Sequence, residues 1–184
     1  MTHRPHFYAA GFFIRVTISP MQTNALYLRT IIFGIIDSLV STVGLLAGID
    51  VAGAPHKTVA LTGIVYAFVE AFSMAVGNFL SEESAEEYES KAGVGGRSSL
   101  LAGAVMFVSF VVAALIPLLP YTLFADSWAL ITSVVLSVIA LFIVGMVSAR
   151  VSRLPMLWRG ARMALLGGAA IIMGVVIGAI VPIS

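Results

Sequence analysis

Five apolar runs, each about long enough to cross a bilayer, dominate this sequence and leave few folds open to it. The hydrocarbon core of a membrane is about 30 Å thick, and a helix of roughly 20 residues crosses it. The runs cover residues 30–49, 59–80, 100–119, 128–149 and 163–183. They do not alternate between apolar and polar residues, as the strands of a membrane barrel do. We therefore predict an all-α protein, a polytopic membrane bundle of five transmembrane helices.

Composition supports this prediction and excludes several classes of protein. Hydrophobic residues make up 60% of the chain and charged residues only 10%, too few to cover the surface of a soluble domain. The formal net charge is +1, so we expect no nucleic-acid partner. The chain has no cysteine, which excludes disulfides and thiolate metal sites. The expected solvent and partner is a lipid bilayer.

The positions of Lys and Arg predict the orientation. If the N-terminus is cytoplasmic, every Lys and Arg except Lys57 falls in a cytoplasmic segment. We therefore expect a cytoplasmic tail at residues 1–28, a transmembrane domain at 29–184 and a C-terminus on the outer or luminal side. No histidine lies in a span, so His3, His6 and His56 are expected to be solvated without a specific role.

Two acidic residues lie well inside the predicted spans, Asp37 in the first and Glu70 in the second. A carboxylate in hydrocarbon costs several kcal/mol, so such a residue is a candidate functional site. Counting about 1.5 Å per residue from the helix ends places both acids at similar depth in the cytoplasmic half. Each belongs to a stripe of small and polar residues, and helix packing alone is the alternative explanation.

Other possible ligands follow on the second span. Met74 is one turn after Glu70, Asn78 one turn after Met74, and an acidic segment containing Glu82, Glu86 and Glu89 comes next. Oxygen donors with one thioether suit Fe²⁺ or Mn²⁺ better than Cu⁺ or Zn²⁺. We therefore predict a divalent metal site formed by Asp37, Glu70, Met74, Asn78, Glu82, Glu86 and Glu89. For the acidic segment, a solvated helix end is an equally good interpretation.

Three motifs occur together: RTIIFGIIDSLVS at 29–41, FSMAVGNFLS at 72–81 and IPLLPY at 116–121. In this order they resemble the vacuolar iron transporter family, over nearly the whole chain from about Tyr27. The resemblance implies a five-span homodimer that exports cytosolic Fe²⁺, and often Mn²⁺, in exchange for protons. It implies an ion path between the subunits, with contributions from Asp37 and Met74. It also implies the vacuolar membrane in a eukaryote or the inner membrane in a prokaryote.

The sequence departs from this family in two places. Many members have Glu where this chain has Asn78, which lowers the charge at the cytoplasmic mouth. Members that capture metal carry a long cytoplasmic domain between the second and third spans, whereas this chain has only a short segment there. Only residues 82–89 could stand in for the first helix of that domain.

These observations lead to one function and two alternatives. We expect a proton-coupled divalent metal transporter with no resident cofactor, in which the metal displaces protons from the buried carboxylates. A membrane scaffold or assembly protein would use the small-residue stripes for association alone. A proton-coupled transporter of another small cation would need more polar or aromatic residues along the path. An enzyme is not expected, because no span carries a pair of nucleophile and base.

Overall fold

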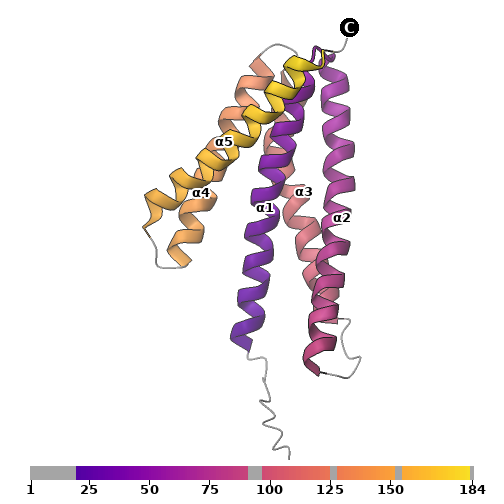
Figure 1. The fold of residues 1–184 in the computed structure, drawn as a ribbon, viewed down its shortest axis with the longest axis vertical. Helices are drawn as coiled ribbons and strands as arrows, with labels where there is room; N and C mark the ends of the chain where they lie inside the picture. The colour runs from indigo at the N-terminus through magenta and orange to yellow at the C-terminus, as the bar shows by residue number, and fades with distance from the viewer. Residues whose placement is uncertain (1–19, 91–96, 125–127, 152–154, 183–184) are drawn as a thin grey trace, which may run out of the picture.

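Five long helices form the whole of the described structure (Figure 1). The computed structural model describes residues 20–90, 97–124, 128–151 and 155–182. All five helices are long and apolar enough to cross a membrane, so the predicted five-helix fold is confirmed. The helices are α1 (Pro20–Val51), α2 (His56–Ser90), α3 (Arg97–Leu123), α4 (Trp128–Val151) and α5 (Met156–Ile180).

Several helices extend beyond the apolar runs. α1 begins ten residues before the predicted span at residue 30, and α5 begins at Met156 rather than residue 163. α2 continues through the acidic segment and has 35 residues, a length of about 52 Å. Hydropathy identifies the residues that lie in hydrocarbon. A helix is held by its backbone hydrogen bonds, so it can continue beyond those residues into water. Of the predicted tail at 1–28, residues 1–19 lie outside the described residues.

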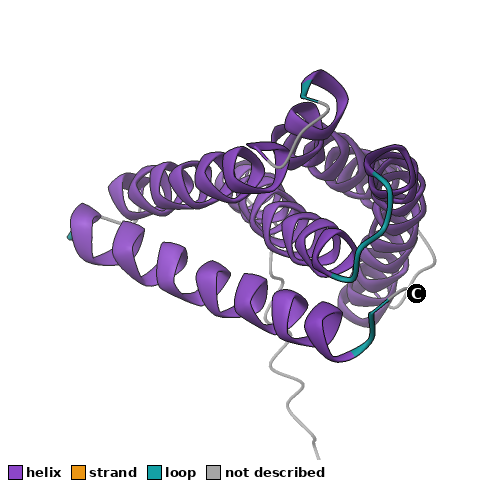
Figure 2. Cartoon of the chain, turned by 90° about the horizontal axis from the view of Figure 1, so that it is seen from above, coloured by secondary structure: helices purple, strands orange, loops and turns teal. Residues whose placement is uncertain are grey.

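α1 is the central helix of the bundle. It packs against each of the other four helices, while α2 packs mainly on α3 and α5 packs on α1 and α4. Figures 1 and 2 show α1, α2 and α3 side by side and the α4–α5 pair inclined against them. The two ends of the bundle differ, since α2 carries the acidic segment at one and the short α1–α2 turn lies at the other. We call them the acidic end and the turn end.

The turn between α1 and α2 is tight. Gly53 has a φ of 93°, a left-handed conformation that glycine adopts without steric cost. Its amide donates to the Asp50 carbonyl, and the Ala54 amide donates to the Ile49 carbonyl. This turn places His56 against the end of α1, so the expectation that His56 is simply solvated is wrong: its Nδ1 atom is buried.

The buried hydroxyl groups of Ser38 and Ser133 donate hydrogen bonds to backbone carbonyls of a neighbouring helix, whereas the buried Thr42 hydroxyl has no hydrogen-bond partner among the described residues. The Ser38 hydroxyl of α1, which is fully buried, donates to the Phe110 carbonyl of α3 at 2.7 Å. The Ser133 hydroxyl of α4 donates to the Pro117 carbonyl of α3 at 2.8 Å. These bonds fasten the helices to one another where no water can compete.

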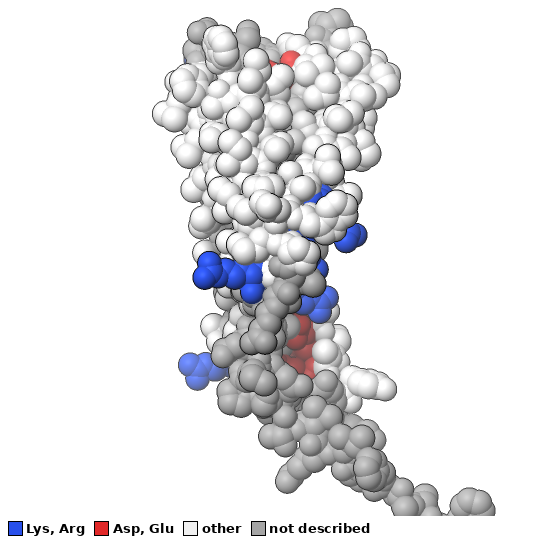
Figure 3. Space-filling model, turned by 90° about the vertical axis from the view of Figure 1, so that its left-hand side faces the viewer, with Lys and Arg blue, Asp and Glu red and all other residues white. Residues whose placement is uncertain are grey.

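Basic side chains gather toward the acidic half of the molecule. Figure 3 shows Lys and Arg, and most of the visible Asp and Glu, in the lower part, with a broad white surface above them. The white surface is apolar because the exposed side chains of the spans are mainly Leu, Ile, Val and Phe. This asymmetry agrees with the charge pattern of the sequence. From that pattern, a cytoplasmic location of the acidic end stays a prediction.

Glycines let α1 and α5 approach until their backbones touch. A Cβ atom added to Gly174 would collide with the Gly44 carbonyl oxygen, and one added to Gly178 would collide with the Gly48 carbonyl oxygen. A Cβ on Gly48 would lie 2.8 Å from the Gly174 carbonyl oxygen. Small residues at helix contacts are typical of membrane bundles, where close packing replaces the hydrophobic effect.

We expect Gly178→Ala to destabilise the bundle by about 1–3 kcal/mol, because the methyl group must push α1 and α5 apart. Gly168→Ala is the matched control on the same helix, since a Cβ there meets no atom within 4 Å. Survival of the monodisperse peak in size-exclusion chromatography after heating in detergent measures the difference. Equal loss of stability in both variants would contradict the close contact.

Candidate functional site

Asp37 of α1 and Glu70 of α2 lie close enough for their charges to interact. Both side chains are partly buried. The sequence placed them at similar depth, and the packing of α1 and α2 brings them onto adjoining surfaces. Two carboxylates at this separation repel each other when both are charged, and a divalent cation or protons relieve that repulsion.

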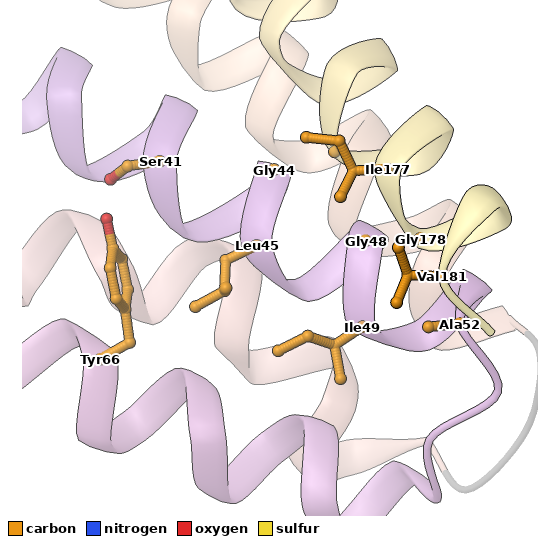
Figure 4. Close-up of a pocket in the computed structure, with 11 residues that line it drawn as sticks. Ser41, Gly44, Leu45, Gly48, Ile49, Ala52, Tyr66, Ile177, Gly178 and Val181 are labelled. Carbon is orange, nitrogen blue, oxygen red and sulfur yellow. The ribbon is translucent and has the colours of Figure 1, made fainter. Parts of the chain in front are cut away.

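Tyr66 and Ser41 adjoin the acidic pair. Ser41 is one turn after Asp37, and its hydroxyl donates to the Asp37 carbonyl at 2.6 Å. Tyr66 is one turn before Glu70, and its hydroxyl faces that of Ser41 (Figure 4). Tyr66 interacts electrostatically with both carboxylates. Asp37, Ser41, Tyr66 and Glu70 therefore form one polar cluster between α1 and α2.

A cavity extends from this cluster toward the turn end. Its volume is about 520 Å³, and it lies between α1, α2 and α5 (Figure 4). Apart from Ser41 and Tyr66, its lining is apolar or glycine: Gly44, Leu45, Gly48, Ile49, Ala52, Gly174, Ile177, Gly178 and Val181. The same glycines that allow α1 and α5 to touch thus also leave open space beside the contact.

Met74 lies one turn beyond Glu70 on α2 and is partly exposed. Its neighbours Phe72, Ser73 and Gly77 are exposed, and a Cβ added to Gly77 would meet nothing within 4 Å. Met74 lines neither the large cavity nor the smaller one described next. Its side chain therefore belongs to an open face of α2.

A second cavity, of about 210 Å³, lies nearer the acidic end. It brings together two of the predicted ligands, Asn78 and Glu82, with Thr30 and Arg29 of α1 and Met106 of α3. The Nδ2 atom of Asn78 is buried and has no hydrogen-bond partner among the described residues. The cavity is hence a polar vestibule below the acidic pair.

The acidic segment is helical, because α2 continues through it. Glu86 faces α3 and accepts a hydrogen bond from the Ser99 hydroxyl at 3.2 Å. Glu89 lies in α2, and its side chain is outside the described residues. The structure thus separates the predicted ligands into four places: the acidic pair, the open face of α2 with Met74, the vestibule and the outer part of α2.

Within the described ranges, no group of three or more His, Cys, Asp or Glu residues could hold a metal ion. Asp37 and Glu70 would supply two carboxylates, whereas an octahedral ion takes six donor atoms. Hydroxyl groups, the Met74 thioether, water or a second copy of the chain would have to supply the rest. Sequence reasoning missed Tyr66, although a phenol one helical turn from an intramembrane acid is a signal for it.

Comparisons with known proteins identify the family of this chain. The model of the VIT family matches residues 28–96 and 91–179, with the two parts meeting between α2 and α3. The chain belongs to the VIT family. It is also 30% identical over 156 residues to vacuolar iron transporter homolog 1 of Arabidopsis thaliana, covering 79% of this chain and 78% of that protein. The resemblance seen in the sequence is confirmed, and the protein is an integral membrane protein.

We expect Asp37→Asn to fold and to be at least as heat-stable as the unmodified protein at pH 8, because the amide removes a charge beside Glu70. The neighbouring Ser38→Ala variant should be less stable by about 1–2 kcal/mol, since it leaves the Phe110 carbonyl without its donor. Size-exclusion chromatography after heating compares the two. Loss of the folded peak in Asp37→Asn would show that the carboxylate serves structure.

Proposed function

We propose that this protein exports cytosolic Fe²⁺ or Mn²⁺ across its membrane in exchange for protons. The observation that carries the proposal is the pairing of Asp37 with Glu70 inside the membrane-spanning region. Membership of the VIT family supports metal transport, and the name of the relative from Arabidopsis supports iron.

The acidic pair couples the two fluxes through competition. An empty pair in a low-dielectric region binds protons, because two adjacent negative charges there are costly. A divalent cation binds only to the deprotonated carboxylates, so each carboxylate that becomes a ligand releases its proton. A site that holds either protons or metal exchanges one for the other as it faces each side of the membrane in turn.

The vestibule is the proposed route from the cytosol. Glu82 attracts the cation there against the opposing charge of Arg29, and the oxygens of Asn78 and Thr30 replace part of its water shell. The acidic segment beyond it would concentrate cations near the mouth. Because Asn78 is uncharged, the vestibule holds the ion weakly enough to pass it on to Glu70 and Asp37.

A homodimer is part of the proposal. α2 packs much less extensively on α1 than it does on α3. The outward face of α2 is exposed and apolar. The exposed side chains on this helix include Leu61, Val65, Phe68, Val69, Phe72 and Val76. This apolar face is turned by about half the helix circumference from Glu70 and Met74, so it suits lipid. A second copy packed instead against the exposed small residues Ser73, Gly77 and Ser81, which adjoin Glu70 and Met74 on α2, would bring two acidic pairs and two Met74 thioethers together and complete the coordination that one chain lacks. Placement in a vacuolar membrane, or in the inner membrane of a prokaryote, follows the family resemblance.

Asp37→Asn should abolish metal-driven proton flux. The test reconstitutes purified protein in liposomes with a pH dye and a divalent-sensitive dye inside, then adds Fe²⁺, kept reduced, or Mn²⁺ outside under a pH gradient. Glu87 is exposed and is not one of the predicted ligands, so Glu87→Gln is the matched control: it should keep the coupling of metal to protons and lower the flux only slightly.

Metal entry coupled to proton exit, and lost in Asp37→Asn, is the expected result. Undiminished coupled flux in Asp37→Asn would refute the role of the acidic pair. Absence of any flux from a folded, unmodified sample would favour the membrane scaffold or a transporter of another cation.

Met74→Ala should lower the preference for Fe²⁺ over Mn²⁺ by about 3–10-fold, because a thioether is a softer ligand and Fe²⁺ the softer ion. Met74→Leu keeps the volume and removes the sulfur, so it separates ligation from packing. Competition between the two ions in the same liposomes gives the ratio. If Leu preserves the preference while Ala does not, Met74 acts by shape alone.

A further inference from the structure

Three polar side chains from three helices meet at the turn end of the bundle. Asp50 comes from the last turn of α1, His56 is the first residue of α2, and Tyr121 is the last residue of the IPLLPY motif on α3. The Nδ1 atom of His56 lies 3.8 Å from Oδ1 of Asp50. The rings of His56 and Tyr121 have centroids 6.4 Å apart, and Tyr121 interacts electrostatically with Asp50. None of these residues belongs to the proposed transport site.

The polar atoms of this cluster converge without bonding to one another. Tyr121 is only 5% exposed, and its hydroxyl has no hydrogen-bond partner among the described residues. The Nδ1 atom of His56 is likewise buried and without one. A separation of 3.8 Å is too long for a hydrogen bond between His56 and Asp50. Burying such groups unpaired is unfavourable, so the cluster would gain from a ligand that bonds to its members.

We propose that Asp50, His56 and Tyr121 form a second site for a divalent transition-metal ion. Two ligands of one ion, each about 2.0–2.2 Å from it, can be as much as about 4.2 Å apart, so the observed separation suits a shared ion with little movement. Imidazole and carboxylate ligands suit Fe²⁺, Co²⁺ and Zn²⁺.

This site is distinct from the acidic pair. Asp50 is 13 residues after Asp37, which separates the two by about 20 Å along α1 and turns them to different sides of the helix. The side chains of His56 and Asp50 are 33% and 14% exposed, so water reaches the site at its edge. With three protein ligands and access to solvent, the site would bind the ion reversibly. The proposal does not depend on transport, since binding is measured directly.

The test titrates Co²⁺ into tag-free, full-length protein in detergent. The background carries His3→Gln, His6→Gln, Asp37→Asn and Glu70→Gln, so that His56 is the only histidine and the acidic pair cannot bind. Visible absorption of bound Co²⁺ and paramagnetic broadening of the His56 ring signals in NMR report occupancy. His56→Gln and Asp50→Asn remove ligands, Tyr121→Phe removes only the hydroxyl, and Lys57→Gln is the control at an adjacent exposed residue.

We expect saturable Co²⁺ binding that broadens the His56 signals, weakens at least about tenfold in His56→Gln and Asp50→Asn, and is unchanged in Lys57→Gln. In Tyr121→Phe the absorption spectrum should shift. No saturable binding in the background protein, or equal binding after His56→Gln, would overturn the proposal. Water molecules would then be the partners of the three side chains. His56 is partly exposed, so His56→Gln keeps the test decisive should Asp50→Asn misfold. A failure here leaves the liposome result with Asp37→Asn untouched.

Discussion

Hydrocarbon offers no hydrogen-bond partner, and each long helix of this chain must satisfy its backbone within itself. The same constraint acts on side chains. Buried serines donate to carbonyls of neighbouring helices, as Ser38 does to Phe110 and Ser133 to Pro117. Against this background, a polar group without a partner is conspicuous. Among the described residues, such groups are the Thr42 hydroxyl of α1, the Asn78 amide in the vestibule, and Tyr121 and His56 at the turn end.

α1 connects these regions because it is the one helix that packs on all the others. Its stripe of small residues serves two purposes along its length. Near the turn end, Gly44 and Gly48 bring α5 into backbone contact. Nearer the acidic end, Asp37 and Ser41 on the same stripe face α2 and build the polar cluster with Tyr66. The glycines that pack against α5 and the polar groups that face α2 thus adjoin each other along one stripe of α1.

Much of the fold could be predicted from the sequence, and the site only in part. Uninterrupted apolar runs have one physical solution in a membrane, which is why five helices could be predicted. The depth of Asp37 and Glu70 followed from counting residues. The helix extensions beyond the spans carry no hydropathy signal, and the position of Tyr66 against Ser41 depends on how α1 and α2 rotate.

His56 shows why the remainder could not be predicted. From the sequence it is a loop histidine beside a lysine, and solvation is the natural expectation. Only the tight turn at Gly53 folds it back against Asp50, and only the course of α3 brings Tyr121 to it. Contacts between three helices depend on packing that no single stretch of sequence encodes.

The length of α2 has a mechanical consequence. At about 52 Å it is a single rod far longer than the hydrocarbon is thick, and it carries Glu70 within the membrane and Glu86 beyond it. A rigid helix rotates as one body, so its part inside the membrane and its part outside turn together. Any rotation that carries Glu70 from one side of the barrier to the other also swings Glu86 away from Ser99 on α3. In the proposed transport cycle the acidic segment and the acidic pair would therefore move together, so a contact that restrains the acidic segment at the surface would also restrain the pair.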